Sequence, residues 1–344
     1  MAFVKGTIVF TDSGFKPIED ISGRDRVLTR NFLGEAQFIQ PFAIKKKKYK
    51  GEVVELGGKT WSLRTTPDHL IPYDPDDKYK GYKFDNIPAK DITCHEDNRI
   101  YRKFKYITPE DYKKETVVIF NEFGKRWSYV YPLDWFVLCG FVLARGYLEP
   151  AGRRRALNIY IKDRTKDQEV AILSDILDRI GVTWKLYPVR SQNRWLLRVS
   201  PNNTLASRLS KRLGSVKRRK MYIADSMIYN SSRELAYTLI DTIKTLTSDQ
   251  FSTNNEKLVD SLVLLGTLWG YSTTKRVKTP KGYVTDWGAV NKTVYSVDFK
   301  PLPTSYSPRY KNILDYDDYV YEIYLFDGQI YIKNETSPIW INPK

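Results

Sequence analysis

The segment Ala2-Phe3-Val4-Lys5-Gly6-Thr7 begins a series of short strand-like runs that continues to residue 125. These runs are rich in β-branched and aromatic residues, and turn-forming residues such as Asp12-Ser13-Gly14 and Gly57-Gly58 separate them. No helical period persists through this stretch. The runs are Val4–Phe10, Arg26–Leu28, Val53–Leu56 and Val117–Phe120. An all-β domain is therefore predicted here.

The period of the apolar residues changes after residue 130. Helical spacing is found at 135–143, 170–180, 235–243 and 258–269, and strand-like segments lie between these stripes. This mixture of helix and strand occurs twice in a similar order, which indicates an internal repeat. Strand-like runs return over 303–342, with a hairpin around Asp327-Gly328.

We therefore predict a β domain formed by residues 1–125 and 303–342, and an α/β domain inserted at 126–302. A host domain tolerates such an insertion when the two ends of the insert lie close together at its surface. The chain has 344 residues, of which 42% are hydrophobic, so it is large enough and apolar enough for two cores.

The net charge of +16 favours a polyanionic partner. Basic residues cluster at Lys45–Lys48, Arg153–Arg155 and Lys217–Lys220. A basic surface that only improves solubility is the alternative. The chain has no apolar run near the ~18 residues of a membrane span, no signal-peptide pattern, and no metal or redox spacing of its two cysteines. We therefore expect a cytoplasmic protein with no membrane partner.

The two ends of the sequence resemble inteins and the related Hint domains. Phe3–Thr7 resembles their opening pattern C-x-x-x-G-T, and Thr66-Pro67-Asp68-His69 resembles their T-x-x-H block. Further resemblances lie at Pro17–Ile21, Gly23–Leu28, Tyr319–Ile323 and Pro338–Asn342. The resemblance implies an all-β, horseshoe-like splicing domain that acts on flanking host-protein segments (exteins) and needs no cofactor.

The resemblance also implies chemical roles. In inteins the thiol or hydroxyl of the first residue attacks the preceding carbonyl, so Ala2 stands at the nucleophile position. His69 would donate a proton to the leaving amide nitrogen, and Thr66 would polarise the same bond. Asn342 would then cyclise through its own side-chain amide and release the downstream peptide.

Four positions depart from the intein pattern. Ala2 carries no nucleophile, and Pro343 stands where Cys, Ser or Thr usually provides the second nucleophile. Ile341 replaces the usual penultimate histidine, and Glu322 occupies a position that usually holds Asp or Cys. Engineering, natural variation and decay are all compatible with these changes. We expect that this chain does not splice.

The middle of the chain resembles the LAGLIDADG homing endonucleases. Its segment Leu138-Cys139-Gly140-Phe141-Val142-Leu143-Ala144-Arg145-Gly146 matches the motif of that family at the first, third, seventh and ninth positions. An ordinary buried helix is the alternative. In the family two motif helices pack together, and Gly140 and Ala144 would allow a close approach. Arg145 replaces the metal-binding acid; a guanidinium cannot ligate Mg²⁺, although it can hold a phosphate.

The second motif helix has two possible registers. One covers Leu239–Thr247 and puts Leu246 at the metal position, whereas the other covers Glu234–Thr242 and puts Asp241 there. We favour the second register, which makes Asp241 the remaining candidate metal ligand. Mg²⁺ would then be the cofactor of any residual nuclease activity.

The resemblance makes double-stranded DNA the expected partner. Lys220 is the candidate for a lysine near the catalytic centre, and the expected DNA contacts are Arg145, Arg153, Arg154, Arg155, Lys217, Arg218 and Arg219. The predicted fold is an all-β Hint domain split by a pseudo-twofold αββαββ LAGLIDADG domain. We expect both chemical activities to be impaired. A free-standing DNA-binding protein or homing endonuclease derived from an intein is the alternative.

Overall fold

The computed structural model describes residues 2–31, 34–58, 61–74, 85–95, 100–101, 105–106, 117–120, 127–151, 154–189, 193–214, 221–248, 250–285, 288–301, 305–326, 328–333 and 339–343. The chain forms two compact units, one made of Met1–Ile107 with Pro301–Lys344 and the other of Thr108–Lys300. The predicted boundary at residue 125 falls inside the second unit. There the strand β12 (Val117–Phe120), which we predicted within the β domain, pairs with β13 (Trp127–Val130).

A closed four-stranded barrel joins strands from both pieces of the first unit. Its strand order is β1 (Phe3–Val4), β24 (Tyr310–Tyr324), β6 (Ala43–Gly57) and β7 (Ser62–Thr65). The two long strands, β6 and β24, pair antiparallel along their whole length. Between β24 and β7, Phe3 of β1 lies opposite both Tyr321 and Thr65. The first strand of the chain is thus held by strands from both pieces.

A second sheet of the first unit mixes the two pieces in the same way. Its order is β11 (Lys105–Tyr106), β5 (Glu35–Ile39), β4 (Val27–Arg30), β2 (Ile8–Thr11), β25 (Gln329–Lys333) and β26 (Ile339–Ile341), with β3 (Gly14–Pro17) paired to β2. Two smaller pairs are β8 (Leu70–Tyr73) with β9 (Asp85–Pro88), and β10 (Ile100–Tyr101) with β23 (Ser305–Tyr306). The short 3₁₀ turns are η1 (Ile18–Asp20) and η3 (Ala89–Asp91).

Apolar residues from both pieces form one core in the first unit. Phe3 and Leu56 come from the first piece, and Tyr321 and Ile341 from the second. Each fully buried side chain of this size contributes roughly 1.5–3 kcal/mol. Neither piece could bury these residues alone, so the first unit folds only when the two pieces come together.

The second unit combines helices with two separate sheets. The elements of its first half are α1 (Pro132–Arg145), β14 (Gly146–Ala151), β15 (Arg154–Lys162), η4 (Asp163–Thr165), α2 (Lys166–Ile180), β16 (Trp184–Val189), β17 (Arg194–Val199) and α3 (Asn203–Leu213). Those of its second half are α4 (Asp225–Tyr229), α5 (Arg233–Thr247), β18 (Gln250–Thr253), α6 (Glu256–Leu268), β19 (Tyr271–Thr279), β20 (Val284–Thr285), β21 (Gly288–Ala289) and β22 (Val294–Pro301). No described helix is long and apolar enough to span a membrane.

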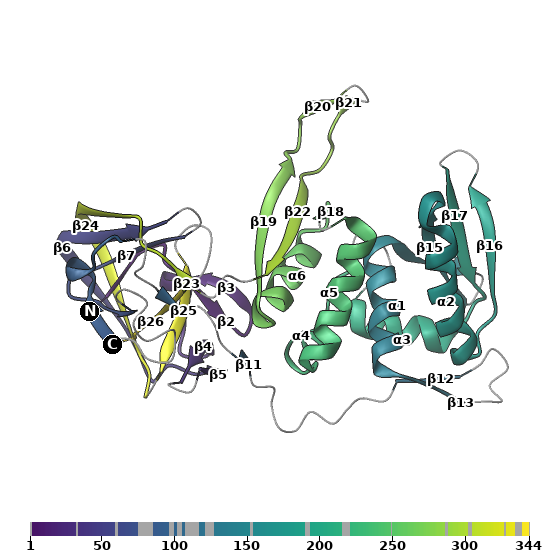
Figure 1. Ribbon diagram of the computed structural model, residues 1–344, viewed down its shortest axis with the longest axis horizontal. Helices are drawn as coiled ribbons and strands as arrows, with labels where there is room; N and C mark the ends of the chain where they lie inside the picture. The colour runs from purple at the N-terminus through teal and green to yellow at the C-terminus, as the bar shows by residue number, and fades with distance from the viewer. Residues whose placement is uncertain are drawn as a thin grey trace. The chain divides into compact units, whose positions relative to one another are not determined.

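The two halves meet through a pair of helices. α1 and α5 lie side by side, with the sheet β14-β15-β17-β16 beyond one of them and the sheet β18-β22-β19 beyond the other (Figure 1). A Cβ atom on Gly140 would lie 2.7 Å from the Cβ of Thr242, which is closer than side chains tolerate. The close approach of α1 and α5 therefore requires the glycine, as the sequence predicted.

In the described part of the second half, one strand lies between the first two long helices where the predicted αββαββ pattern has two. The first half follows α1-β14-β15-α2-β16-β17, whereas the described second half follows α5-β18-α6-β19-β22, with β20 and β21 extending the β19–β22 hairpin (Figure 1). Only Gln250–Thr253 form a strand before α6 begins at Glu256. This interval is too short for a hairpin, so the internal repeat is incomplete.

Candidate functional site

A tight turn after β7 carries both residues of the predicted T-x-x-H block. The backbone N–H of His69 donates to the carbonyl of Thr66 at 3.0 Å and closes the turn. The N–H of Ala89, at the end of the β8–β9 hairpin, donates to the carbonyl of His69 at 2.9 Å. The turn is therefore hydrogen-bonded to the β8–β9 hairpin, and it directly follows strand β7 of the barrel. These two attachments fix the positions of its side chains.

Thr66 holds the backbone of Ala2. The N–H of Ala2 donates to Oγ1 of Thr66 at 3.0 Å, and the N–H of Thr66 donates to the carbonyl of Ala2 at 3.1 Å. The nitrogen of Ala2 belongs to the peptide bond that the predicted first step would break. The methyl side chain of Ala2 has no atom that could attack this bond.

The other end of the chain reaches the same turn through Asn342. The Nε2 atom of His69 lies 2.8 Å from the carbonyl oxygen of Asn342. Because a carbonyl oxygen only accepts hydrogen bonds, Nε2 must carry the proton and donate it. The carbonyl belongs to the peptide bond between Asn342 and Pro343. The structure therefore brings Ala2, Thr66, His69 and Asn342 into one buried site.

A residue that the sequence analysis missed holds the side chain of Asn342. The Nδ2 atom of Asn342 donates to Oδ1 of Asn86 at 2.7 Å. Asn86 lies on β9, opposite Pro72 of β8. No local motif marks this residue, because only the pairing of β8 with β9 brings it beside the turn.

His69 is neutral at pH 7. Its side chain is fully buried, and the ring of Phe3 packs against it with 4.6 Å between the ring centroids. Burial lowers the pKa of His69 from 6.5 to about 4, although the hydrogen bond to Asn342 acts in the opposite direction. Its Nδ1 atom has no hydrogen-bond partner within the described part of the chain. The neutral ring can therefore stabilise negative charge on the Asn342 oxygen without giving up its proton.

Two of the substituted positions serve packing and local ion pairing. Ile341 is fully buried in the apolar core and pairs with Ile330 of β25. The buried carboxylate of Glu322 accepts hydrogen bonds from Nζ of Lys47 at 3.0 Å and from the hydroxyl of Tyr324 at 2.6 Å. Ile341 thus contributes apolar burial where the intein pattern has an imidazole.

The basic cluster Lys45–Lys48 lies on β6, opposite acidic and aromatic residues of β24. Nζ of Lys48 is 3.0 Å from the carboxylate of Asp317, and Nζ of Lys46 is 4.0 Å from the centroid of the Tyr319 ring. These neighbours offset the charge of the cluster locally. The case for a polyanionic partner therefore depends mainly on the second unit.

Arg145 ends α1 and bridges to two other helices of the second unit. Its Nη1 donates to both carboxylate oxygens of Glu169, at 2.9 and 2.7 Å, and its Nη2 donates to the carbonyl of Leu246. The hydroxyl of Thr165 donates to the same carboxylate at 2.6 Å. The Arg145 and Glu169 side chains are only 11% and 8% exposed. The guanidinium satisfies a terminal carbonyl of α5, where positive charge is favourable.

The end of α5 bears on the register of the second motif helix. The first motif ends with its helix, since α1 ends at Arg145. By the same rule the second motif ends near Thr247, where α5 ends. The carbonyl of Leu246 at this end is the one that Arg145 contacts. This contact agrees with the register that puts Leu246 at the metal position, and the register with Asp241 there stays a prediction.

Asp241, the candidate metal ligand, has a protein partner in this structure. It lies inside α5, and its carboxylate accepts a hydrogen bond from the hydroxyl of Tyr271 at 3.0 Å. Burial and this carboxylate both raise the pKa of Tyr271. The Tyr271 hydroxyl therefore keeps its proton and donates the hydrogen bond to Asp241. Our assignment relied on the sequence interval to the next glycine, which does not determine where a helix ends.

The ends of α1 and α5 do not fit Mg²⁺. This ion prefers carboxylate and water oxygens, whereas the guanidinium of Arg145 occupies these helix ends and binds the carboxylate of Glu169 and the carbonyl of Leu246. Within the described ranges, no group of three or more His, Cys, Asp or Glu side chains could hold a metal ion. The guanidinium itself supplies the positive charge at this point.

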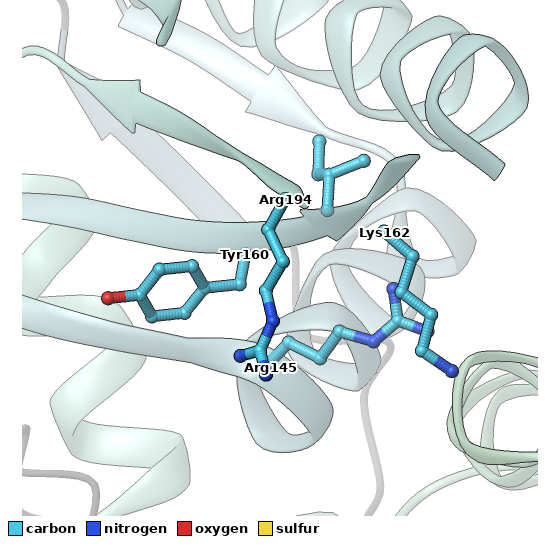
Figure 2. Close-up of a pocket in the computed structure, with 5 residues that line it drawn as sticks. Arg145, Tyr160, Lys162 and Arg194 are labelled. Atoms are coloured by element: carbon cyan, nitrogen blue, oxygen red, sulfur yellow. The ribbon is translucent and has the colours of Figure 1, made fainter. Parts of the chain in front are cut away.

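A basic pocket lies beside Arg145. It has a volume of about 220 Å³ and is lined by Arg145, Tyr160, Ile161, Lys162 and Arg194. The three basic side chains converge on it from the end of α1 and from two neighbouring strands (Figure 2). Lys162 and Arg194 are directly opposite on β15 and β17, where like charges repel. Burial, followed by the charge of Arg145, lowers the pKa of Lys162. A bound anion would relieve this repulsion.

The sequence analysis singled out neither Lys162 nor Arg194, because only strand pairing brings them together. Of the DNA contacts that it did predict, Arg155 is exposed on β15. The side chain of Arg154 lies outside the described residues, and so do Arg153, Lys217, Arg218, Arg219 and the candidate lysine Lys220.

Comparison with solved structures finds both kinds of protein that the sequence resembles. A splice-inactive variant of the AceL NrdHF class 3 split intein is 25% identical over 29% of this chain and 63% of its own, with a TM-score of 0.26. A bacterial intein-like domain from Clostridium thermocellum is 21% identical over 29% of this chain and 66% of its own, with a TM-score of 0.25. This chain thus spans less than two thirds of either.

The homing endonuclease I-DmoI, in complex with DNA and Mn, is 13% identical over 49% of this chain and 90% of its own, with a TM-score of 0.36. A scan against protein-family models finds no match, and a search of curated proteins finds none either.

The buried His69 predicts a pH dependence of stability. Because its pKa is about 4 in the folded chain and 6.5 when exposed, the unfolded state alone takes up a proton between these values. Stability is therefore lost as the pH falls from 6.5 to 4, by up to about 3 kcal/mol. In His69→Gln this loss should disappear, as measured by urea unfolding across the pH range. His95→Gln, at the only other histidine, should keep the slope of the unaltered chain. Equal slopes for all three proteins would contradict the assignment.

The ion pair of Arg145 and Glu169 predicts strong coupling. Arg145→Met should destabilise the second unit by about 3–5 kcal/mol, because it leaves a buried carboxylate without its charge partner. Adding Glu169→Leu should recover much of this loss in the free energy of unfolding. Arg179→Met, which removes the solvent-accessible ion pairs with Asp175 and Asp134, should cost about 1 kcal/mol or less and serves as the control. Additive effects of the two substitutions would exclude the coupling.

Proposed function

We propose that the first unit is a protein-splicing domain of the intein type that has lost its first step and retains its last. This proposal rests on one observation: Ala2 and Asn342, near the two ends of the chain, both bind the same turn, through Thr66 and His69. A splicing element needs both of its ends in one site, because it must break the bond at each end. An unrelated β domain has no such requirement.

Ala2 blocks the first step in this proposal. An acyl shift needs a thiol or hydroxyl on residue 2, and a methyl group has neither. Pro343 offers no side-chain nucleophile to accept an acyl group from upstream. Without a nucleophile at either position, the two flanks cannot be joined.

The last step requires only Asn342 and a means of stabilising charge. Its Nδ2 attacks its own carbonyl carbon, the bond to the Pro343 nitrogen breaks, and the amide proton passes to that nitrogen. The products are a C-terminal succinimide and a free Pro343 amine. The N–H at Nε2 of His69, 2.8 Å from the carbonyl oxygen, would stabilise the oxyanion that forms on the way. Because Ile341 provides no base, this cyclisation should be slow.

We further propose that the second unit binds double-stranded DNA without cutting it. The basic pocket formed by Arg145, Lys162 and Arg194 would hold a backbone phosphate, and exposed basic residues such as Arg155 would add contacts. Cleavage in this class of nuclease needs carboxylates for a divalent metal, and the ends of α1 and α5 carry none. The chain as a whole is thus an intein-type element with a nested LAGLIDADG-type unit, impaired in both chemistries.

Fusion of unrelated polypeptides to both ends tests the splicing proposal. We expect no ligated product, and slow release of the C-terminal flank, because only the cyclisation step is available. Intact-mass spectrometry should find a succinimide on the released chain. The Asn342→Ala control should abolish this release. A ligated product from the unaltered sequence would refute the block at Ala2.

Binding measurements with duplex DNA test the second proposal. If at least six phosphates are neutralised, affinity should fall about 10³-fold between 50 and 200 mM salt. Arg194→Gln should weaken binding and reduce the salt slope by about one, whereas Lys50→Gln, on the first unit, should leave both unchanged. Supercoiled plasmid should remain uncut with Mg²⁺. A flat salt dependence or double-strand cleavage would contradict the proposal.

A further inference from the structure

We propose that Asn86 is a positioning residue for the cyclisation of Asn342. This inference rests on the proposed function of the first unit and extends it to a residue outside every intein-like segment of the sequence. The two polar groups that react are each held by one side chain. His69 binds the carbonyl oxygen of Asn342 at 2.8 Å, and Asn86 binds its attacking amide nitrogen at 2.7 Å.

The β8–β9 hairpin carries Asn86 and is hydrogen-bonded to the turn that carries His69. β8 directly follows the turn that ends at His69, and β9 carries Asn86. Asn86 pairs with Pro72, and the neighbouring pair of the hairpin is Ile71 with Ile87. Ile71 is fully buried, which anchors the hairpin in the core. The two points that hold Asn342 therefore belong to one hydrogen-bonded element. Asn86 itself is exposed, so its substitution should leave the fold intact.

The contact matters because an amide is a weak nucleophile with several orientations. A free asparagine side chain rotates about two bonds, and only some rotamers bring Nδ2 towards its own carbonyl carbon. An acceptor that binds an N–H of Nδ2 restricts this rotation before the reaction. The amide oxygen of Asn86 is too weak a base to keep the proton, which still passes to the Pro343 nitrogen. Asn86 thus orients Asn342 and takes no part in the proton balance.

The direction of the hydrogen bond is part of the proposal. As described, Asn342 donates and Asn86 accepts. If Asn86 donated instead, to the side-chain oxygen of Asn342, it would draw electrons away from the attacking nitrogen and slow the reaction. An acceptor-only replacement distinguishes the two cases, since a carboxylate can accept this bond but cannot donate it.

The experiment compares variants of the unaltered chain fused to a C-terminal flank. Release of the flank should slow about tenfold in Asn86→Ala, the loss expected for one hydrogen bond made in the reacting geometry. In Asn86→Asp the rate should equal or exceed that of the unaltered chain at neutral pH. Measured relative to the unaltered chain at the same pH, which corrects for the protonation of His69, it should fall towards that of Asn86→Ala as the pH drops below roughly 4, where a carboxyl group protonates. A merely structural role for Asn86 would not produce this pH profile.

Controls separate failure of this inference from failure of the proposed function. Asn312→Ala removes another exposed asparagine of the same unit and should leave the rate unchanged. If Asn342→Ala stops the release while Asn86→Ala leaves it unchanged, only the role of Asn86 is refuted. If no release occurs, cyclisation itself fails as the function. Hydrogen exchange of the Asn342 side-chain amide then still tests the contact by NMR, since equal exchange in the unaltered chain and Asn86→Ala would overturn it.

Discussion

The hydrogen bonds from Ala2 to Thr66 and from His69 to Asn342 are the constraint on which the arrangement of the first unit depends. The second bond joins the two pieces of this unit, so it forms only when their strands lie together. β1 therefore lies between β24 and β7, and β2 lies beside β25. The shared apolar core makes this interleaving favourable, because each piece leaves apolar faces that only the other covers. Folding of the unit and assembly of its site are one event.

Much of this could be predicted from local sequence. The resemblance of Thr66–His69 and of Pro338–Asn342 to intein blocks pointed to residues that the fold does bring together. The close packing of two helices at Gly140 was also visible, because a glycine in an apolar helix permits a close approach. In each case the informative residues are adjacent in sequence or belong to one helical face.

The features that sequence reasoning missed depend on contacts between distant segments. Asn86 reaches Asn342 only through a hairpin pairing, and Lys162 faces Arg194 only through the register of two strands. The register of the second motif helix could not be read from sequence, because helical periodicity runs through 234–242 and 239–247 alike, whereas the contact of Arg145 with Leu246 depends on tertiary packing. The number of residues between a helix and the next glycine gives only a length of chain. The register of the second motif helix depends instead on how α5 packs against α1.

The side chains at the positions that depart from the two family patterns are integrated into the packing. Ile341 fills the apolar core, and Arg145 joins a buried carboxylate to a helix end. Replacing Ile341 by histidine would bury a polar ring among apolar side chains, and replacing Arg145 by aspartate would set a second carboxylate beside Glu169. Restoring one functional group would therefore cost stability at both sites. Under the proposed function, recovery of either activity therefore requires compensating changes in the surrounding residues. A single reversion would lower the stability of the unit, and this loss would mask any gain in activity.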